Sequence, residues 1–135
     1  MDTMKRVLLA VMVAAIGNSI VYAIAYASGI IPWNMLSPGR GVSITPRLVI
    51  LVSIGGALGG ALLYSIIKRF ASDPVQAFRL VAFLVLLVSF AAPLTIDTFT
   101  RPLTIALDVM HFVVYAATVW ALTGWRQNQQ IKASA

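Results

Sequence analysis

The sequence predicts an all-α integral membrane protein, a four-helix bundle with up-down-up-down topology. Of its 135 residues, 60% are hydrophobic and 10% are charged, whereas soluble domains contain roughly 45–50% apolar and about 25% charged residues. A water-soluble fold of this length cannot hide so much apolar surface, so the bilayer must act as the solvent. The length suits one compact unit, and we expect residues 1–135 to form a single transmembrane domain.

Four apolar segments are long enough to cross a bilayer, which requires about 20 residues per helix. The expected spans are residues 7–30, 48–67, 75–94 and 103–125. Pro74 and Pro102 stand where the last two spans begin, in the first turn, where a helix tolerates proline. The short link between the second and third spans predicts antiparallel neighbours. The longest link contains a turn signal at Ser37–Arg40, and the polar residues from Arg126 onward predict a frayed end.

The basic residues give an orientation, because cytoplasmic loops carry an excess of lysine and arginine. One predicted side carries Lys5, Arg6, Lys68, Arg69, Arg79, Arg126 and Lys132, and the other carries Arg40, Arg47 and Arg101. We therefore expect both termini in the cytoplasm. The formal charge of +6 is explained by these topology signals, and basic loops this short offer no surface for reading nucleic acid.

Glycines in the second span predict close helix packing. Gly55, Gly56, Gly59 and Gly60 form two overlapping GxxxG patterns. Lipid tails are as apolar as leucine, so membrane helices associate through close backbone approach and interhelical hydrogen bonds rather than through hydrophobicity. The glycine face is therefore expected to meet a helix of the same chain or of a second copy or partner. The bilayer itself is the other expected contact.

A polar stripe runs along the fourth span. Its residues, Thr104, Asp108, His111, Tyr115 and Thr118, are spaced by four, three, four and three, which places them on one helix face. Ionisable side chains inside a span are costly and mark candidate functional sites. The opposite face is apolar, so we expect the stripe to point into the bundle and not at lipid.

Polar residues of the other spans are expected at similar depth. At ~1.5 Å per residue, Asp108 lies roughly 8 Å and His111 roughly 13 Å below the outer end of its span. The candidate pocket comprises Asn18, Tyr22, Ser89, Asp108, His111 and Tyr115. In the functional interpretation, Asp108 holds the imidazole of His111 in one tautomer, and Tyr115 or Asn18 bonds the second nitrogen. In the structural interpretation, these groups form a hydrogen-bond network that fixes packing.

Other chemistry has little support in the sequence. The chain has no cysteine and one histidine, so disulfides and thiolate metal sites are excluded, and a zinc site would need help from carboxylates or a second copy. No catalytic triad surrounds Ser89, and the glycines lack the lysine and hydroxyl residue of a phosphate loop. We therefore predict no catalytic residues, no metal and no cofactor.

Several segments together resemble a known family. These are Asn18, Phe78–Ala82, Ser89 with Pro93, and the run from Leu107 to His111, which ends in a Met-His pair. They are similar to uncharacterised four-helix membrane proteins of actinobacteria and related bacteria, catalogued as a domain of unknown function. The resemblance covers roughly residues 7–124. It implies a four-helix fold in the bacterial plasma membrane and no established activity.

Three functions stay open. The first is a non-enzymatic accessory or assembly subunit of a membrane complex, favoured by the glycine face and the near-absence of soluble mass. The second is a transporter or channel for protons or a small solute, favoured by Asp108 and His111. The third is a haem- or quinone-binding protein that uses His111.

Overall fold

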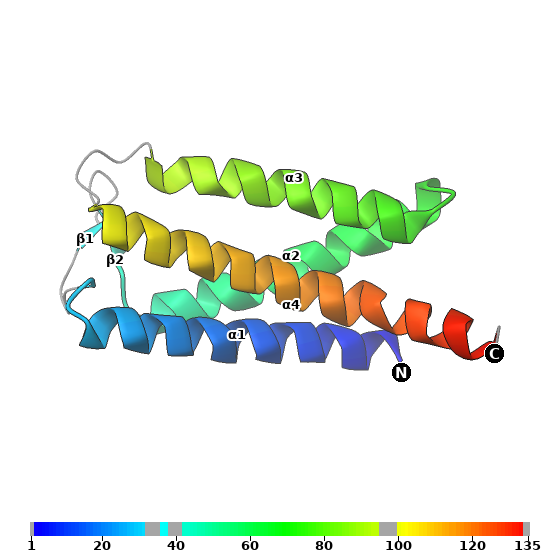
Figure 1. The fold of residues 1–135 in the computed structure, drawn as a ribbon, viewed down its shortest axis with the longest axis horizontal. Coiled ribbons are helices and arrows are strands. Elements are labelled where there is room, and N and C mark those ends of the chain that lie inside the picture. Colours follow the sequence, from blue (N-terminus) through cyan, green and yellow to red (C-terminus); the bar gives the residue numbers. More distant parts are fainter. Residues whose placement is uncertain (1, 32–35, 38–41, 95–99, 134–135) are drawn as a thin grey trace.

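The four predicted spans are four helices in the structure, a computed structural model that describes residues 2–31, 36–37, 42–94 and 100–133. The helices are α1 (Thr3–Ala27), α2 (Pro46–Phe70), α3 (Pro74–Leu94) and α4 (Arg101–Ala133). Each is long and apolar enough to cross a membrane. The start of α1 and the end of α4 lie at the same end of the bundle as the α2–α3 turn, and the end of α3 and the start of α4 lie at the opposite end (Figure 1). The expected all-α bundle with up-down-up-down topology is therefore confirmed.

Local sequence signals explain where the helices begin. Thr45 precedes α2, and its side-chain oxygen accepts a hydrogen bond from the backbone N–H of Leu48. Asp73 precedes α3, and its Oδ1 accepts from the backbone N–H groups of Val75 and Gln76, both at 3.1 Å. Such caps satisfy N–H groups that have no partner within the helix. Pro46 and Pro74, which follow these caps, occupy the first turn of their helices; for Pro74 this was predicted.

The end of α1 depends on a glycine. Gly29 has a φ of 72°, a conformation that only glycine adopts without strain. It lets the backbone N–H of Ile30 return to the carbonyl of Ala25 at 2.9 Å. This closing bond ends the helix at Ala27, three residues before the predicted limit.

One detail of the prediction was wrong. The tail from Arg126 was expected to be frayed, but α4 continues to Ala133. After Gly124 this segment has no glycine or proline and is rich in residues with high helix propensity. The first link also contains a pair of two-residue antiparallel strands, β1 (Leu36–Ser37) and β2 (Val42–Ser43), about which the sequence analysis made no prediction. Residues 38–41, which contain most of the predicted turn, lie outside the described residues.

α4 is the centre of the bundle, because it packs against each of the other three helices. Its contact with α1 is the most extensive. The expected neighbours α2 and α3 do pack antiparallel, but their mutual contact is the least extensive of the helix pairs that pack together. The large apolar side chains on the outer surfaces are exposed to the hydrocarbon that a membrane supplies.

The interior is divided into three layers along the bundle axis. The middle layer is made of alanines: Ala10, Ala14, Ala57, Ala117 and Ala121. Small side chains let helix backbones approach closely, which is how membrane helices associate. Larger residues fill the two ends: Tyr22, Ile31, Ile44 and Leu103 near the first link, and Tyr64, Phe78 and Leu122 near the α2–α3 turn.

Candidate functional site

The polar stripe of α4 lies partly inside the bundle. Thr118 is buried, and the other four members are half-buried. On the predicted apolar face, Val109 and Phe112 are exposed, at 42% and 53% of their surface. Val113 is different, because a Cβ placed on Gly17 would lie 2.8 Å from its Cγ1. Part of the apolar side of α4 therefore lies on the surface of the bundle, and part of it packs closely against α1.

His111 is oriented by its own helix. Its Nδ1 lies 2.7 Å from the carbonyl oxygen of Leu107. A carbonyl only accepts, so Nδ1 carries the proton, and in the neutral ring Nε2 is a hydrogen-bond acceptor. The sequence had predicted Asp108 as the group that sets this tautomer, but the bond that fixes the ring runs to the backbone. No described residue hydrogen-bonds Nε2, so neither predicted partner, Tyr115 or Asn18, reaches it.

Asp108 is half-buried, and its Oδ1 is a buried atom without a hydrogen-bond partner among the described residues. A buried polar atom without a partner is costly in hydrocarbon. Asp108 borders neither of the two cavities described below. The carboxylate is therefore close to His111 in sequence but does not share its cavities.

Asn18 forms an interhelical hydrogen bond. The sequence indicated Asn18 as a buried polar residue but did not predict this partner. Its Nδ2 donates to Ser53 Oγ at 2.8 Å, and the Ser53 hydroxyl donates to the carbonyl of Val49 at 2.6 Å. Because the Ser53 proton is already used, its oxygen must accept, and this fixes the amide orientation of Asn18. The amide oxygen of Asn18 is then left buried and without a partner among the described residues.

Tyr22 lies away from the cavities and has a structural contact. Its hydroxyl donates to the carbonyl of Ile44 at 3.2 Å, just before α2 begins. The ring belongs to the buried apolar cluster near the first link. This bond ties α1 to the entry of α2, and the residue does not join the other candidates.

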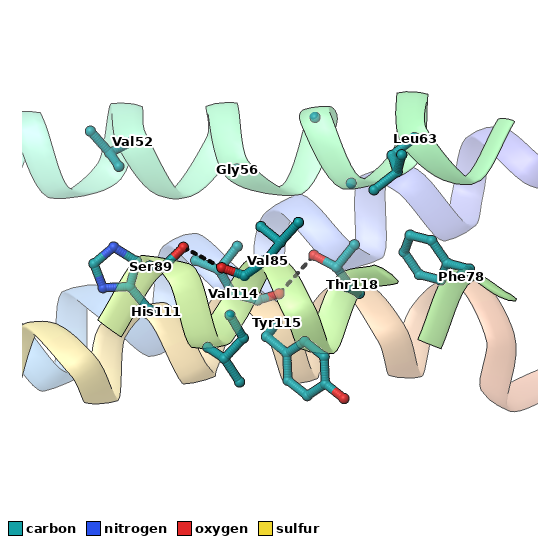
Figure 2. A pocket seen from close by; sticks show the side chains of 14 residues that line it. Val52, Gly56, Leu63, Phe78, Val85, Ser89, His111, Val114, Tyr115 and Thr118 are labelled. Atoms are coloured by element: carbon teal, nitrogen blue, oxygen red, sulfur yellow. Dashed lines mark hydrogen bonds between the residues drawn. The ribbon is translucent and has the colours of Figure 1, made fainter. Parts of the chain in front are cut away.

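The larger cavity is a groove between α2 and α3 whose floor is α4 (Figure 2). We call it the α2–α3 groove, and its volume is about 360 Å³, within the usual range for ligand pockets. The α2 wall includes Val52, Gly56, Gly59, Gly60 and Leu63; the α3 wall includes Phe78, Ala82, Val85, Leu86 and Ser89; the floor includes His111, Val114, Tyr115 and Thr118. Three of the six predicted pocket residues, Ser89, His111 and Tyr115, therefore line one cavity.

A smaller cavity of about 140 Å³ lies among α1, α2 and α4. Asn18, Ser53 and His111 are among its lining residues. His111, Val52 and Val114 line both cavities. His111 thus lies where the two cavities adjoin. The polar residues that were predicted to line one pocket are instead distributed between two cavities, and some line neither.

The four glycines of α2 divide into two pairs. A Cβ on Gly56 would lie 3.0 Å from Val114 Cγ1, and one on Gly60 would lie 2.6 Å from Thr118 Cγ2. This pair therefore receives side chains of α4 inside the chain. A Cβ on Gly55 or Gly59 would meet no atom within 4 Å. Among the described residues, no side chain packs against the second pair.

One buried contact escaped the sequence analysis. Thr123 is fully buried, and its Oγ1 accepts from Arg79 Nε at 3.2 Å while donating to the carbonyl of Val119 at 2.7 Å. The available signal was that Arg79 stands five residues inside α3, where a cation needs a polar partner. Among the described residues, no three histidine or acidic side chains gather as metal ligands would.

Comparison with known proteins adds one finding to this geometry. No curated protein and no solved structure matches the chain. Its four apolar helices make it a multi-pass membrane protein in contact with the bilayer. Residues 2–129 match a family of unknown function, DUF6069, and the chain belongs to that family.

Proposed function

We propose that the chain is a non-enzymatic subunit of a larger membrane assembly, and that α2 docks a transmembrane helix of another protein. The proposed docking surface, which we call the outward glycine face, comprises Leu51, Gly55, Leu58, Gly59 and Leu62. The proposal places the chain in the bacterial plasma membrane with both termini in the cytoplasm, on the excess of basic residues at that end.

One observation supports the proposal. On its inner side, α2 has a pair of glycines that lets another helix pack closely, and a second pair of glycines lies on its outer side. On the inner side, Gly56 and Gly60 leave room for Val114 and Thr118 of α4. On the outer side, Gly55 and Gly59 are exposed, and Leu58 is 48% exposed beside them. Such a notch between leucines admits the side chains of a packed helix.

The experiment compares assembly sizes of the full chain in a mild detergent. Gly55→Leu fills the outward notch, and the Cβ that it adds meets no described atom within 4 Å. We expect this variant to lose the larger assembly while its own fold stays intact. Ala23→Leu, at an exposed alanine of α1, is the matched control and should leave the assembly unchanged.

Two outcomes would contradict the proposal. If wild type and Gly55→Leu had the same assembly size, the outward glycine face would not be a docking surface. If the wild-type assembly contained only copies of this chain, the partner would be a second copy and the subunit role would be replaced by self-association.

A second candidate function is passage of protons or a small solute past His111. The observation that favours it is that His111 borders both cavities, with Nε2 left as an acceptor. His111→Ala should then abolish pH-driven flux in proteoliposomes that contain the wild-type assembly. Flux equal to wild type in that variant would remove this candidate.

A further inference from the structure

The α2–α3 groove is long and narrow. Phe78 and Ser89 mark its two ends on α3, and Val52 and Leu63 mark them on α2 (Figure 2). Each pair is 11 residues apart, which corresponds to about 16 Å at ~1.5 Å per residue. A helix of that length and about 10 Å diameter would need several times the 360 Å³ available. The shape therefore suits an extended chain better than a second helix.

The mouth of the groove faces hydrocarbon. Val52 and Val85 line it from opposite walls and are 61% and 53% exposed. His111 lies ten residues from the start of α4, or about 15 Å, which is near the middle of a bilayer core about 30 Å thick. A phospholipid keeps its head group at the membrane surface, so the polar end of the groove is out of its reach. An occupant must enter from the bilayer interior and be apolar over most of its length.

The polar atoms of the groove are acceptors. The hydroxyls of Ser89 and Thr118 donate to carbonyls of their own helices, at Val85 and Val114. The hydroxyl of Tyr115 points away from α2 (Figure 2). His111 has already committed its Nδ1 proton to the backbone.

The remaining nitrogen, Nε2, points toward α2, which forms one wall of the groove (Figure 2). It is absent from the buried unpartnered atoms of the described residues, so it is accessible from the cavities that His111 lines. A guest must therefore bring a donor. An ester, an ether or an oxidised quinone has only acceptors and would leave Nε2 unsatisfied.

We propose that the α2–α3 groove binds a lipid-soluble molecule with a single chain and a hydroxyl head. The hydroxyl donates to Nε2 of His111, and the chain extends along Gly56 and Gly60 toward Phe78. Because glycine has no side chain, the α2 wall does not protrude into the groove. A Cβ at Gly59, which lies between Gly56 and Gly60, would project into free space. Gly59 lies at the border between the groove and the outward glycine face and belongs to both. The proposed site is nevertheless lined by this chain alone and does not require a docked partner.

The test uses the histidine as its own reporter, because His111 is the only histidine of the chain. The full chain, labelled with ¹⁵N-histidine, is titrated in micelles with farnesol and, separately, with farnesyl methyl ether. The alcohol can donate a hydrogen bond and the ether cannot. We expect farnesol to shift the Nε2 resonance, to saturate at one molecule per chain and to bind roughly tenfold tighter than the ether.

Two variants locate the head and the chain. His111→Phe should bind alcohol and ether equally, as measured by displacement of tritiated farnesol. Ala82→Phe adds a ring to the α3 wall and should weaken binding at least tenfold while leaving the Nδ1 resonance unchanged, because the bond to Leu107 lies outside the groove. Ala23→Phe and Gly55→Leu, both outside the groove, should bind farnesol as wild type does.

Equal shifts with farnesol and the ether, or no shift with either, would overturn the proposal, and this comparison needs only the wild-type chain. Wild-type affinity in Ala82→Phe would place any binding outside the groove. Loss of binding in Gly55→Leu would mean that the site depends on the assembly and is not built by this chain alone.

Discussion

Two interfaces of the bundle differ in how they are packed. Where α1 meets α4, alanines fill the interior, and Gly17 brings the backbone of α1 close to Val113. Where α2 meets α3, the contact is the least extensive of the helix pairs that pack together, and a groove of about 360 Å³ separates the walls. The difference lies in what the small residues meet. In the first interface, a side chain of the neighbouring helix fills the space beside the small residue. In the second, the space beside Gly59 is empty.

Small residues in a membrane helix therefore have two uses. A small residue opposite a branched side chain allows close helix packing, which membrane helices need because lipid gives no hydrophobic drive. A small residue with no side chain opposite it leaves a space that another molecule can occupy. α2 contains both kinds one residue apart, at Gly55 and Gly56 and again at Gly59 and Gly60.

The largest effect is expected where a side chain is forced into the closed packing. Gly60→Leu places a Cβ 2.6 Å from Cγ2 of Thr118, which is a buried, β-branched residue. We expect it to lower the free energy of unfolding in micelles by about 3 kcal/mol, at the upper end of overpacking effects. Gly55→Leu, on the outer side of the same helix, should stay within about 0.5 kcal/mol of wild type. Equal losses in the two variants would show that the glycine pairs do not differ.

An intermediate effect is expected at the Asn18–Ser53 hydrogen bond. Ser53→Ala leaves the buried Asn18 Nδ2 without its acceptor, which should cost about 1–2 kcal/mol. Asn18→Leu removes that donor together with the unpartnered Oδ1, so its cost should be smaller, near the ~0.6 kcal/mol average for membrane hydrogen bonds. The double variant should resemble Asn18→Leu alone in an unfolding titration. A larger loss for Asn18→Leu than for Ser53→Ala would contradict this account.

The smallest effect is expected in the open groove. Ala82→Leu extends a half-buried α3 side chain that lines the groove, where no close packing has to be displaced. We expect its free energy of unfolding to lie within about 0.5 kcal/mol of wild type. A loss comparable to that of Gly60→Leu would mean that α2 and α3 pack closely in the membrane.

Much of the fold followed from the sequence because hydropathy and span length are strong constraints in a bilayer. The four spans, their order and the first-turn positions of Pro74 and Pro102 were all predicted. The extension of α4 beyond Trp125 was missed, because a polar helix that projects from the membrane has no hydropathy signal. The early end of α1 depends on a backbone turn at Gly29 that apolar periodicity does not reveal.

The site was harder to predict, because it depends on how helices rotate against each other. Residue spacing placed Asp108 and His111 on one face, and both are half-buried. It could not show that the carbonyl of Leu107 takes the Nδ1 proton, since any helical histidine has such a carbonyl four residues before it. Nor could it show that Gly56 and Gly60 face inward while Gly55 and Gly59 do not, because all four belong to overlapping patterns.

The difference between the two interfaces can be measured directly, because the chain has no native cysteine. Cysteine pairs are introduced at Gly17 with Val113 and, separately, at Gly59 with Val85, and oxidised in native membranes. A disulfide needs Cβ atoms about 3.5–4.5 Å apart. The account predicts rapid crosslinking of the first pair and none of the second, since a Cβ at Gly59 has no neighbour within 4 Å. Crosslinking of the second pair as readily as the first would contradict it.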